Sequence, residues 1–408
     1  GSGKKIAELE EAMKKSRFME IIGVLSVSLI VTSSLGISGT LPFMLEYFNT
    51  YPRSSVETLV SVPAAAMTVI IALSPILTKR LPGRLLICAG LTVIGVFGMI
   101  PFYTGSYWVI LLSRALLGVG IGLVNTRAVS MIGERFTGNL RSRLQGIRVS
   151  AETLGQTALT LIAGQLLVFG WKYAFLIYLS AFVILFLYAA FVPADPEASL
   201  EEKIPETRGS KNKGMSGRER TLTLLLALLG GLFVSTTVAN SLRIPAYIVE
   251  LQAGTAVLGT RILSLSMFSG LLGGLCFGKL LKEIKIWLLP CSLLGTAAGL
   301  VIIGTAKEAL LIGTGAVLCG FFLTCGLSFV FNRLAEQISR TSLNTANAAV
   351  LVGCNLGASA SPYILKLIGT VNTGVPAGFI TYGILYIAIG AAAAAWNLWK
   401  NKRKSALI

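Results

Sequence analysis

The sequence predicts an all-α membrane protein with twelve transmembrane helices in two six-helix bundles. Of its 408 residues, 54% are hydrophobic and only 13% are charged, whereas a soluble domain carries about 25% charged residues. The apolar residues lie in runs of about 20, the length of helix that crosses roughly 30 Å of hydrocarbon. These runs form two sets of six, separated by one long polar stretch.

The polar breaks between the apolar runs place the individual helices. The first set is predicted at 18–43, 54–78, 84–103, 107–133, 143–168 and 173–193. The second set is predicted at 221–249, 257–281, 286–305, 309–334, 342–368 and 374–398. Residues 194–220 carry twelve charged side chains, too many to cross lipid. We interpret this stretch as a solvated linker, which Pro196 and Pro205 interrupt.

These breaks divide the chain into an N-terminal bundle, 18–193, and a C-terminal bundle, 221–398, joined by the linker 194–220. Residues 1–17 form a cytoplasmic N-terminal segment in this prediction, and residues 399–408 form a cytoplasmic tail. The first three residues, Gly1 to Gly3, resemble the remnant of an expression tag. Whether residues 4–17 belong to the natural protein stays open.

The distribution of Lys and Arg predicts the orientation in the membrane. With the N-terminus inside, 27 of the 35 basic residues fall in inner segments, five in outer segments and three within spans. Basic residues gather on the cytoplasmic side of membrane proteins. We therefore expect a multi-pass protein of the cell membrane with both termini in the cytoplasm.

The two halves also match each other weakly at an offset of 202 residues. Identical residues at this offset are Gly118 and Gly320, Glu134 and Glu336, and Leu154-Gly155 and Leu356-Gly357. Parallel repeats of this kind build some two-bundle transporters. Chance matches between common residues are the alternative explanation.

The composition excludes several other functions. The net charge of +17 lies in short segments between apolar runs, not on one face or arm, so we expect no nucleic-acid partner. There is no histidine, and the six cysteines all lie in apolar stretches without a CxxC pair. We therefore expect no metal site, no disulfide framework and no cofactor. A phosphate-binding Gly-x-x-x-x-Gly-Lys-Ser/Thr loop is also absent from the sequence.

Several motifs resemble the major facilitator superfamily of transporters. The fourth span contains Arg114 followed by Gly118, Gly120 and Gly122, similar to the fourth-helix motif of that family. The loop after helix 2, residues 74–84, keeps the family's basic residues but lacks its aspartate. Because it lacks this acidic partner, the loop departs from the inner-gate latch that the family motif implies. The resemblance implies two bundles that expose a central site to one side of the membrane at a time.

Three arginines within spans are candidate substrate-binding residues, because a charge near the bilayer centre is costly and is usually functional. For Arg114, which matches the family arginine, the alternative is a structural hydrogen bond to helix-end carbonyls. Arg127 and Arg243 can instead extend their long stems to the headgroups. Because Pro245 follows Arg243, we also expect a broken helix there, with carbonyls freed beside the central site.

Glu152 is the one clear carboxylate within a span and the candidate for proton coupling, since a carboxyl group in the hydrocarbon can gain and lose a proton near neutrality. A permanent ion pair with a nearby arginine is its alternative. Three amides complete the predicted substrate site: Asn125, Asn240 and Asn355.

We therefore expect a monomeric, proton-coupled secondary transporter of a small organic solute rather than an enzyme. The excess of in-span arginines favours an organic anion. A multidrug or lipid-like exporter of the same fold is the second hypothesis, although helix 5 lacks the Gly-Pro pair typical of many such exporters. A membrane-embedded enzyme would need a catalytic cluster, for which this sequence offers little.

Overall fold

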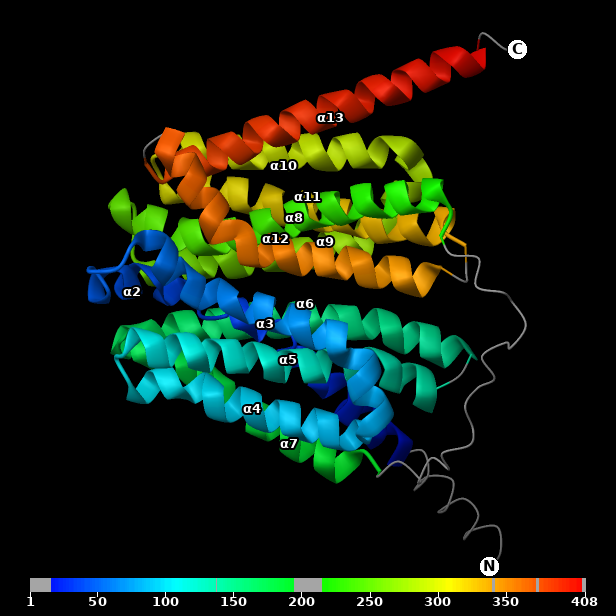
Figure 1. Cartoon of the computed structure of the whole chain (residues 1–408). Coiled ribbons are helices and arrows are strands. Elements are labelled where there is room, and N and C mark those ends of the chain that lie inside the picture. The colour runs from blue at the N-terminus through cyan, green and yellow to red at the C-terminus, as the bar shows by residue number, and fades with distance from the viewer. Residues whose placement is uncertain (1–15, 137, 194–214, 340–341, 372–373, 406–408) are drawn as a thin grey trace, which may run out of the picture.

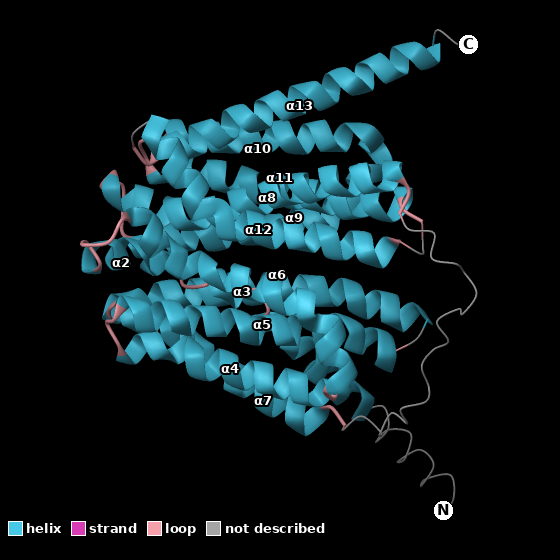
Figure 2. Cartoon of the chain, in the orientation of Figure 1, coloured by secondary structure: helices cyan, strands magenta, loops and turns pink. Residues whose placement is uncertain are grey.

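A computed structural model of the chain describes residues 16–136, 138–193, 215–339, 342–371 and 374–405. Every regular element in this described part is a helix, and none of it is a strand (Figure 2). Most of the predicted N-terminal segment, residues 194–214 of the predicted linker and the last three residues of the predicted tail lie outside the described residues.

The N-terminal bundle consists of the first span and five further helices. The first span comprises Ser16–Ile30 and Ser33–Tyr47, with a bend of 43° between them. The other helices are α3 (Arg53–Arg80), α4 (Gly83–Tyr103), α5 (Tyr107–Arg135), α6 (Gly138–Leu166), and η5 (Trp171–Leu179) continued by α7 (Ser180–Phe191).

The C-terminal bundle consists of six helices without a comparable break. These are α8 (Gly217–Glu250), α9 (Ala256–Ile284), α10 (Leu288–Thr305), α11 (Ala309–Gln337), α12 (Leu343–Val371) and α13 (Pro376–Ser405). The expected break at Pro245 is wrong, because α8 continues through this proline.

The interrupted helix is the first span instead. Its first half ends in the short 3₁₀ turn η1 (Val27–Ile30), and its second half consists of η2 (Ser33–Leu35), η3 (Ser38–Thr40) and α2 (Leu41–Tyr47). The segment is rich in serine, threonine and glycine, and the Thr40 hydroxyl donates to the carbonyl of Ile37 at 2.7 Å. Such local side-chain bonds compete with the α-helical ladder. Gly36 and Gly39 add backbone freedom in the same stretch.

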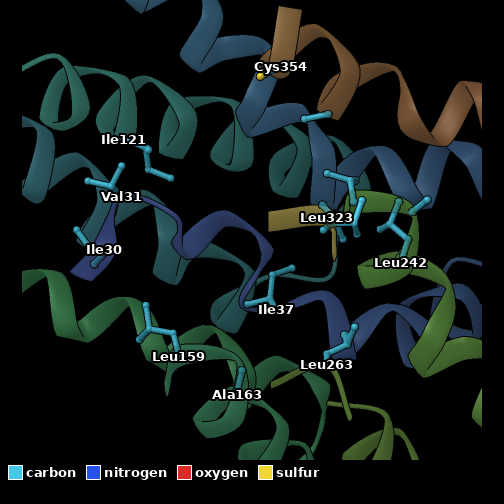
Figure 3. Close-up of a cluster of buried hydrophobic side chains, with 14 of the residues drawn as sticks. Ile30, Val31, Ile37, Ile121, Leu159, Ala163, Leu242, Leu263, Leu323 and Cys354 are labelled. Atoms are coloured by element: carbon cyan, nitrogen blue, oxygen red, sulfur yellow. The ribbon is translucent and has the colours of Figure 1, made fainter. Parts of the chain in front are cut away.

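The two bundles lie side by side with their helices roughly parallel (Figure 1). The described part of the chain begins and ends at the same end of the molecule, which we call the proximal end; the opposite end, which carries α2, is the distal end. The buried apolar core runs from one bundle into the other, as Figure 3 shows for Ile37 of the first span and Leu263 of α9.

The length and composition of the helices fit a membrane protein. In the described part of the chain, nine segments are long and apolar enough to cross a membrane, or ten with the bent first span. One of the nine, 256–305, contains two helices, α9 and α10. With the bent first span, these segments account for eleven of the predicted twelve spans. The twelfth is α6, which is more polar than the others. The all-α, two-bundle membrane fold is therefore confirmed.

Candidate functional site

A cavity of about 340 Å³ lies between the two bundles at mid-depth. Its volume falls within the range of small-molecule sites, about 300–1,000 Å³. The first span, α3 and α6 line it from the N-terminal bundle, and α8, α9, α11 and α12 line it from the C-terminal bundle. Residues near the middle of each helix form the wall, such as Ala64 of α3 and Asn355 of α12. A substrate there would contact both bundles.

The wall of this cavity is uncharged and mixed, with polar groups set in a mostly apolar surface. Eleven of its residues carry hydroxyl or amide groups: Thr32, Ser34, Ser61, Thr153, Gln156, Thr237, Asn240, Ser241, Ser266, Thr324 and Asn355. The others are apolar, including two flexible methionines, Met67 and Met267. No charged side chain of the described residues lines the cavity. The wall therefore suits a solute that forms hydrogen bonds without carrying a net charge.

Two polar groups of the wall are buried without a hydrogen-bond partner, one from each bundle. They are the hydroxyl of Ser61 on α3 and the Oδ1 atom of Asn240 on α8. An unsatisfied buried polar group costs about 1–3 kcal/mol, so a ligand that supplies the missing partners gains affinity here. Of the predicted amides, Asn240 and Asn355 line the cavity, and Asn125 is not part of its wall.

Arg114 is buried inside the N-terminal bundle rather than in the cavity. Its side chain is 0% exposed, and its guanidinium donates to the carbonyl of Leu59 at 3.0 Å, the hydroxyl of Tyr178 at 2.6 Å and the carbonyl of Ser34 at 2.6 Å. These bonds join α5 to α3, to η5 and to the first span. This geometry is the structural alternative that the sequence left open for Arg114.

Arg127 and Glu152 also lie outside the cavity wall. The guanidinium of Arg127 lies against Gly83 at the start of α4, where an added Cβ would overlap it. This position is close to the proximal end. Glu152 forms an ion pair with Arg148 one turn earlier in α6, and its backbone carbonyl accepts a hydrogen bond from Thr32 at 3.0 Å. Its chain neighbour Thr153 lines the cavity, so Glu152 lies beside the site.

Arg243 belongs to an ion-pair cluster at the distal end. Its Nη2 atom lies 3.0 Å from the carboxylate of Glu57, which is 0% exposed. Arg53 contacts the same carboxylate at 3.1 Å and that of Glu250 at 2.9 Å. Glu57 and Arg53 belong to α3, whereas Arg243 and Glu250 belong to α8. The cluster therefore ties the two bundles together, and removing one member of a buried pair costs about 3–5 kcal/mol.

Glu57 was not among the residues that the sequence singled out. The spacing of Arg53 and Glu57, four residues apart in a helix, is the signal for their local pair. The partner Arg243 is 186 residues away in the chain, and no pattern in the sequence links the two.

Other contacts also close the distal end. Thr260 of α9 is fully buried against Gly39 of the first span and Gly164 of α6, where an added Cβ would overlap its side chain. The hydroxyls of Thr58 and Tyr363 meet across the bundles at 3.5 Å. Small residues let helices approach closely in membrane proteins, and here they let the two bundles touch on the distal side of the cavity.

Comparison with known families identifies this architecture. The family model described as Major Facilitator Superfamily matches residues 23–290. The chain belongs to the Major Facilitator Superfamily. As a member, it is a multi-pass membrane transporter rather than an enzyme, and its fold supports secondary transport. No curated protein sequence matches the chain.

Solved structures with this fold include several transporters of the superfamily. A mutant of a peptide transporter POT in complex with alafosfalin has a TM-score of 0.74 at 13% identity, covering 92% of this chain and 93% of that chain. A D-xylose-proton symporter has a TM-score of 0.71 at 15% identity, covering 92% and 97%. A POT family transporter in complex with 5-aminolevulinic acid has a TM-score of 0.71 at 16% identity, covering 92% and 95%. At these identities the likeness shows the fold alone.

Proposed function

We propose that this chain is a secondary transporter of a small, uncharged organic solute that binds by hydrogen bonds in the mid-depth cavity. The observation that carries the proposal is the wall of that cavity, which contains eleven hydroxyl or amide residues and, in the described chain, no charged side chain. Ser61 and Asn240 present unpartnered polar atoms from opposite bundles. A solute that bonds both would couple its binding to the position of the bundles.

This wall supports an uncharged solute better than the organic anion expected from the arginines. Arg114 is engaged by three groups of its own bundle, and Arg243 pairs with Glu57 on the distal side of the cavity. Neither contributes to the wall. The mostly apolar surface of the cavity keeps a multidrug or lipid-like exporter as the second hypothesis, and its hydroxyl and amide groups favour the smaller, hydrogen-bonding solute.

Alternating access follows from the contacts at the two ends. The ion pairs of Glu57 and the packing of Thr260 join the bundles at the distal end. At the proximal end, ion pairs and hydrogen bonds such as Glu20–Arg135 and Glu219–Ser339 connect helices of the same bundle. We infer that the structure represents a state closed at the distal end. The basic residues at the proximal end favour an orientation in which this end faces the cytoplasm.

Uptake into proteoliposomes tests the substrate class. The panel should compare sugars, polyols, amides and nucleosides with organic anions and amines. We expect an uncharged solute to be transported. We expect Asn240→Ala or Asn355→Ala to raise the half-saturation concentration of this solute about tenfold, because the solute would lose one hydrogen-bond partner in a buried site. Asn332→Ala removes an exposed amide of α11 and serves as the matched control. Selective transport of anions, or equal effects of all three variants, would refute this substrate class.

Glu152 remains the candidate that carries the coupling proton. Its pair with Arg148 lies beside the cavity, so protonation would release Arg148 and change the environment of Thr153. We expect Glu152→Gln to remove the dependence of uptake on an imposed pH gradient while leaving counterflow of substrate intact. Uptake that still follows the pH gradient in this variant would assign the proton to another group.

A further inference from the structure

A second pocket lies at the distal end, separate from the mid-depth cavity. Its volume is about 470 Å³, and it is bounded by the start of α3, the end of α8, the end of α12 and the start of α13. Its wall includes the whole ion-pair cluster of Arg53, Glu57, Arg243 and Glu250. No residue of this pocket lines the mid-depth cavity.

The charges around the distal pocket do not cancel. Two carboxylates, Glu57 and Glu250, face three cations, Arg53, Arg243 and Lys366. Glu57 contacts both arginines, and Glu250 contacts Arg53. Among the residues that the structure describes, no carboxylate pairs with Lys366, whose side chain is exposed. One positive charge is left over at the pocket, which attracts an anion.

Unsatisfied donors point to the same conclusion independently. The Nε atom of Arg243 and the Nη2 atom of Arg53 are both buried without a hydrogen-bond partner. Arg243 is only 9% exposed, so bulk water does not readily supply its partner. The two guanidinium groups share one carboxylate, and each has a spare N–H donor. They are therefore suited to bind a second carboxylate, which would accept these hydrogen bonds.

The rest of the wall indicates what the anion carries. Leu365, Ile368 and Val375 give the pocket an apolar side. An added Cβ at Gly369 would meet no atom within 4 Å, so there is room beside the backbone there. A chloride ion would use neither the space nor the apolar side, whereas a short organic chain would use both.

We propose that the distal pocket is a regulatory binding site for a small organic carboxylate, distinct from the transported solute. The carboxylate group would bind Arg53, Arg243 and Lys366, with the organic chain against the apolar side. Arg53 belongs to the N-terminal bundle, and the other two cations belong to the C-terminal bundle. A ligand that bridges them stabilises the state closed at the distal end and slows transport, because it binds that state better than the open one.

Thermal unfolding of the purified full-length protein in detergent tests binding without any transport assay. Sodium acetate and sodium butyrate are titrated at constant ionic strength, with a bulky organic sulfonate as the balancing anion. A ligand of the folded state raises the unfolding temperature in a saturable way. We expect saturation with both carboxylates and tighter binding of butyrate, by roughly fourfold per methylene group buried. We expect Lys366→Gln to raise the half-saturation concentration about tenfold.

The control is Lys307→Gln, which removes the same charge from another exposed position at the distal end. Both lysines are on the surface, so neither substitution should prevent folding. The proposal is overturned if no carboxylate saturates, if Lys366→Gln and Lys307→Gln behave alike, or if chloride matches butyrate. These results are independent of the transported solute, so a wrong substrate class would leave them unchanged.

Discussion

Arg114 illustrates how a charge inside the membrane serves structure. Its position after a run of apolar residues, and before closely spaced glycines, is equally typical of a substrate contact. In the structure it donates to a side chain and two backbone carbonyls of its own bundle and lies 5.6 Å over the ring of Tyr178. Its charge is therefore stabilised by neutral groups and an aromatic face. We infer that it holds the first span against α3 and α5.

Replacing Arg114 by lysine tests this role. A lysine keeps the charge but cannot reach three acceptors with the planar fork of arginine. We expect Arg114→Lys to lower the free energy of unfolding by about 2–4 kcal/mol, the loss of one or two charge-assisted hydrogen bonds, with little change in substrate affinity. Tyr178→Phe removes one of the three partners and should cost less. Thermal unfolding and ligand titration measure the two effects; lost affinity at unchanged stability would assign Arg114 to the binding site.

Individual site residues could be predicted only in part. Asn240 and Asn355 were chosen as polar residues within long apolar spans, and both line the cavity. The hydroxyl residues Ser61, Ser241 and Thr324 were missed, because serine and threonine are common in membrane helices and their position on the inner face depends on the packing of both bundles. Arg114, Arg127 and Arg243 lie outside the cavity wall. The partners of Arg114 and Arg243 come from distant parts of the chain, which no sequence pattern reveals.

At the scale of helices, the sequence was a better guide. Apolar runs bounded by polar breaks predicted all twelve spans, since the thickness of the bilayer fixes their length. The bend in the first span was not predicted. Its cause is local competition by hydroxyl groups, and its position follows from contacts with α6 and α9. Thr260 of α9 packs on both Gly39 and Gly164 there.

Gly164→Ala probes this close contact between α6 and α9. Alanine is the better helix former by about 1 kcal/mol, but its Cβ would overlap the Oγ1 atom of Thr260, and overpacking costs typically 1–3 kcal/mol. We expect a net loss of stability, which Thr260→Gly in the same protein should partly restore, because the Cβ atom of Thr260 also lies only 2.6 Å from the added Cβ. Gly278→Ala is the matched control, because an added Cβ there meets no atom within 4 Å. Thermal unfolding distinguishes them, and equal behaviour of the two alanine variants would contradict the contact.

The whole molecule is a pair of bundles with its central cavity closed on the distal side. The ion pairs of Glu57 and the packing of Thr260 belong to that closure, and both lie between the cavity and the distal end. Buried ion pairs often add specificity rather than stability, which fits a contact that must form in one state and break in another. We therefore expect the equilibrium between the states that are closed and open at the distal end to depend on Glu57.

Labelling of a single cysteine in the cavity tests this account most directly. Thr237→Cys lies in the cavity wall and is introduced after the six native cysteines are replaced. A charged, membrane-impermeant thiol reagent is then added from each side of the membrane. Thr92→Cys, exposed on α4 outside the cavity, is the control and should not react from either side. We predict that Thr237→Cys reacts from the proximal side alone, and from both sides once Glu57→Gln is added. Reaction from the distal side in the protein with Glu57 intact, or from neither side, would contradict the account.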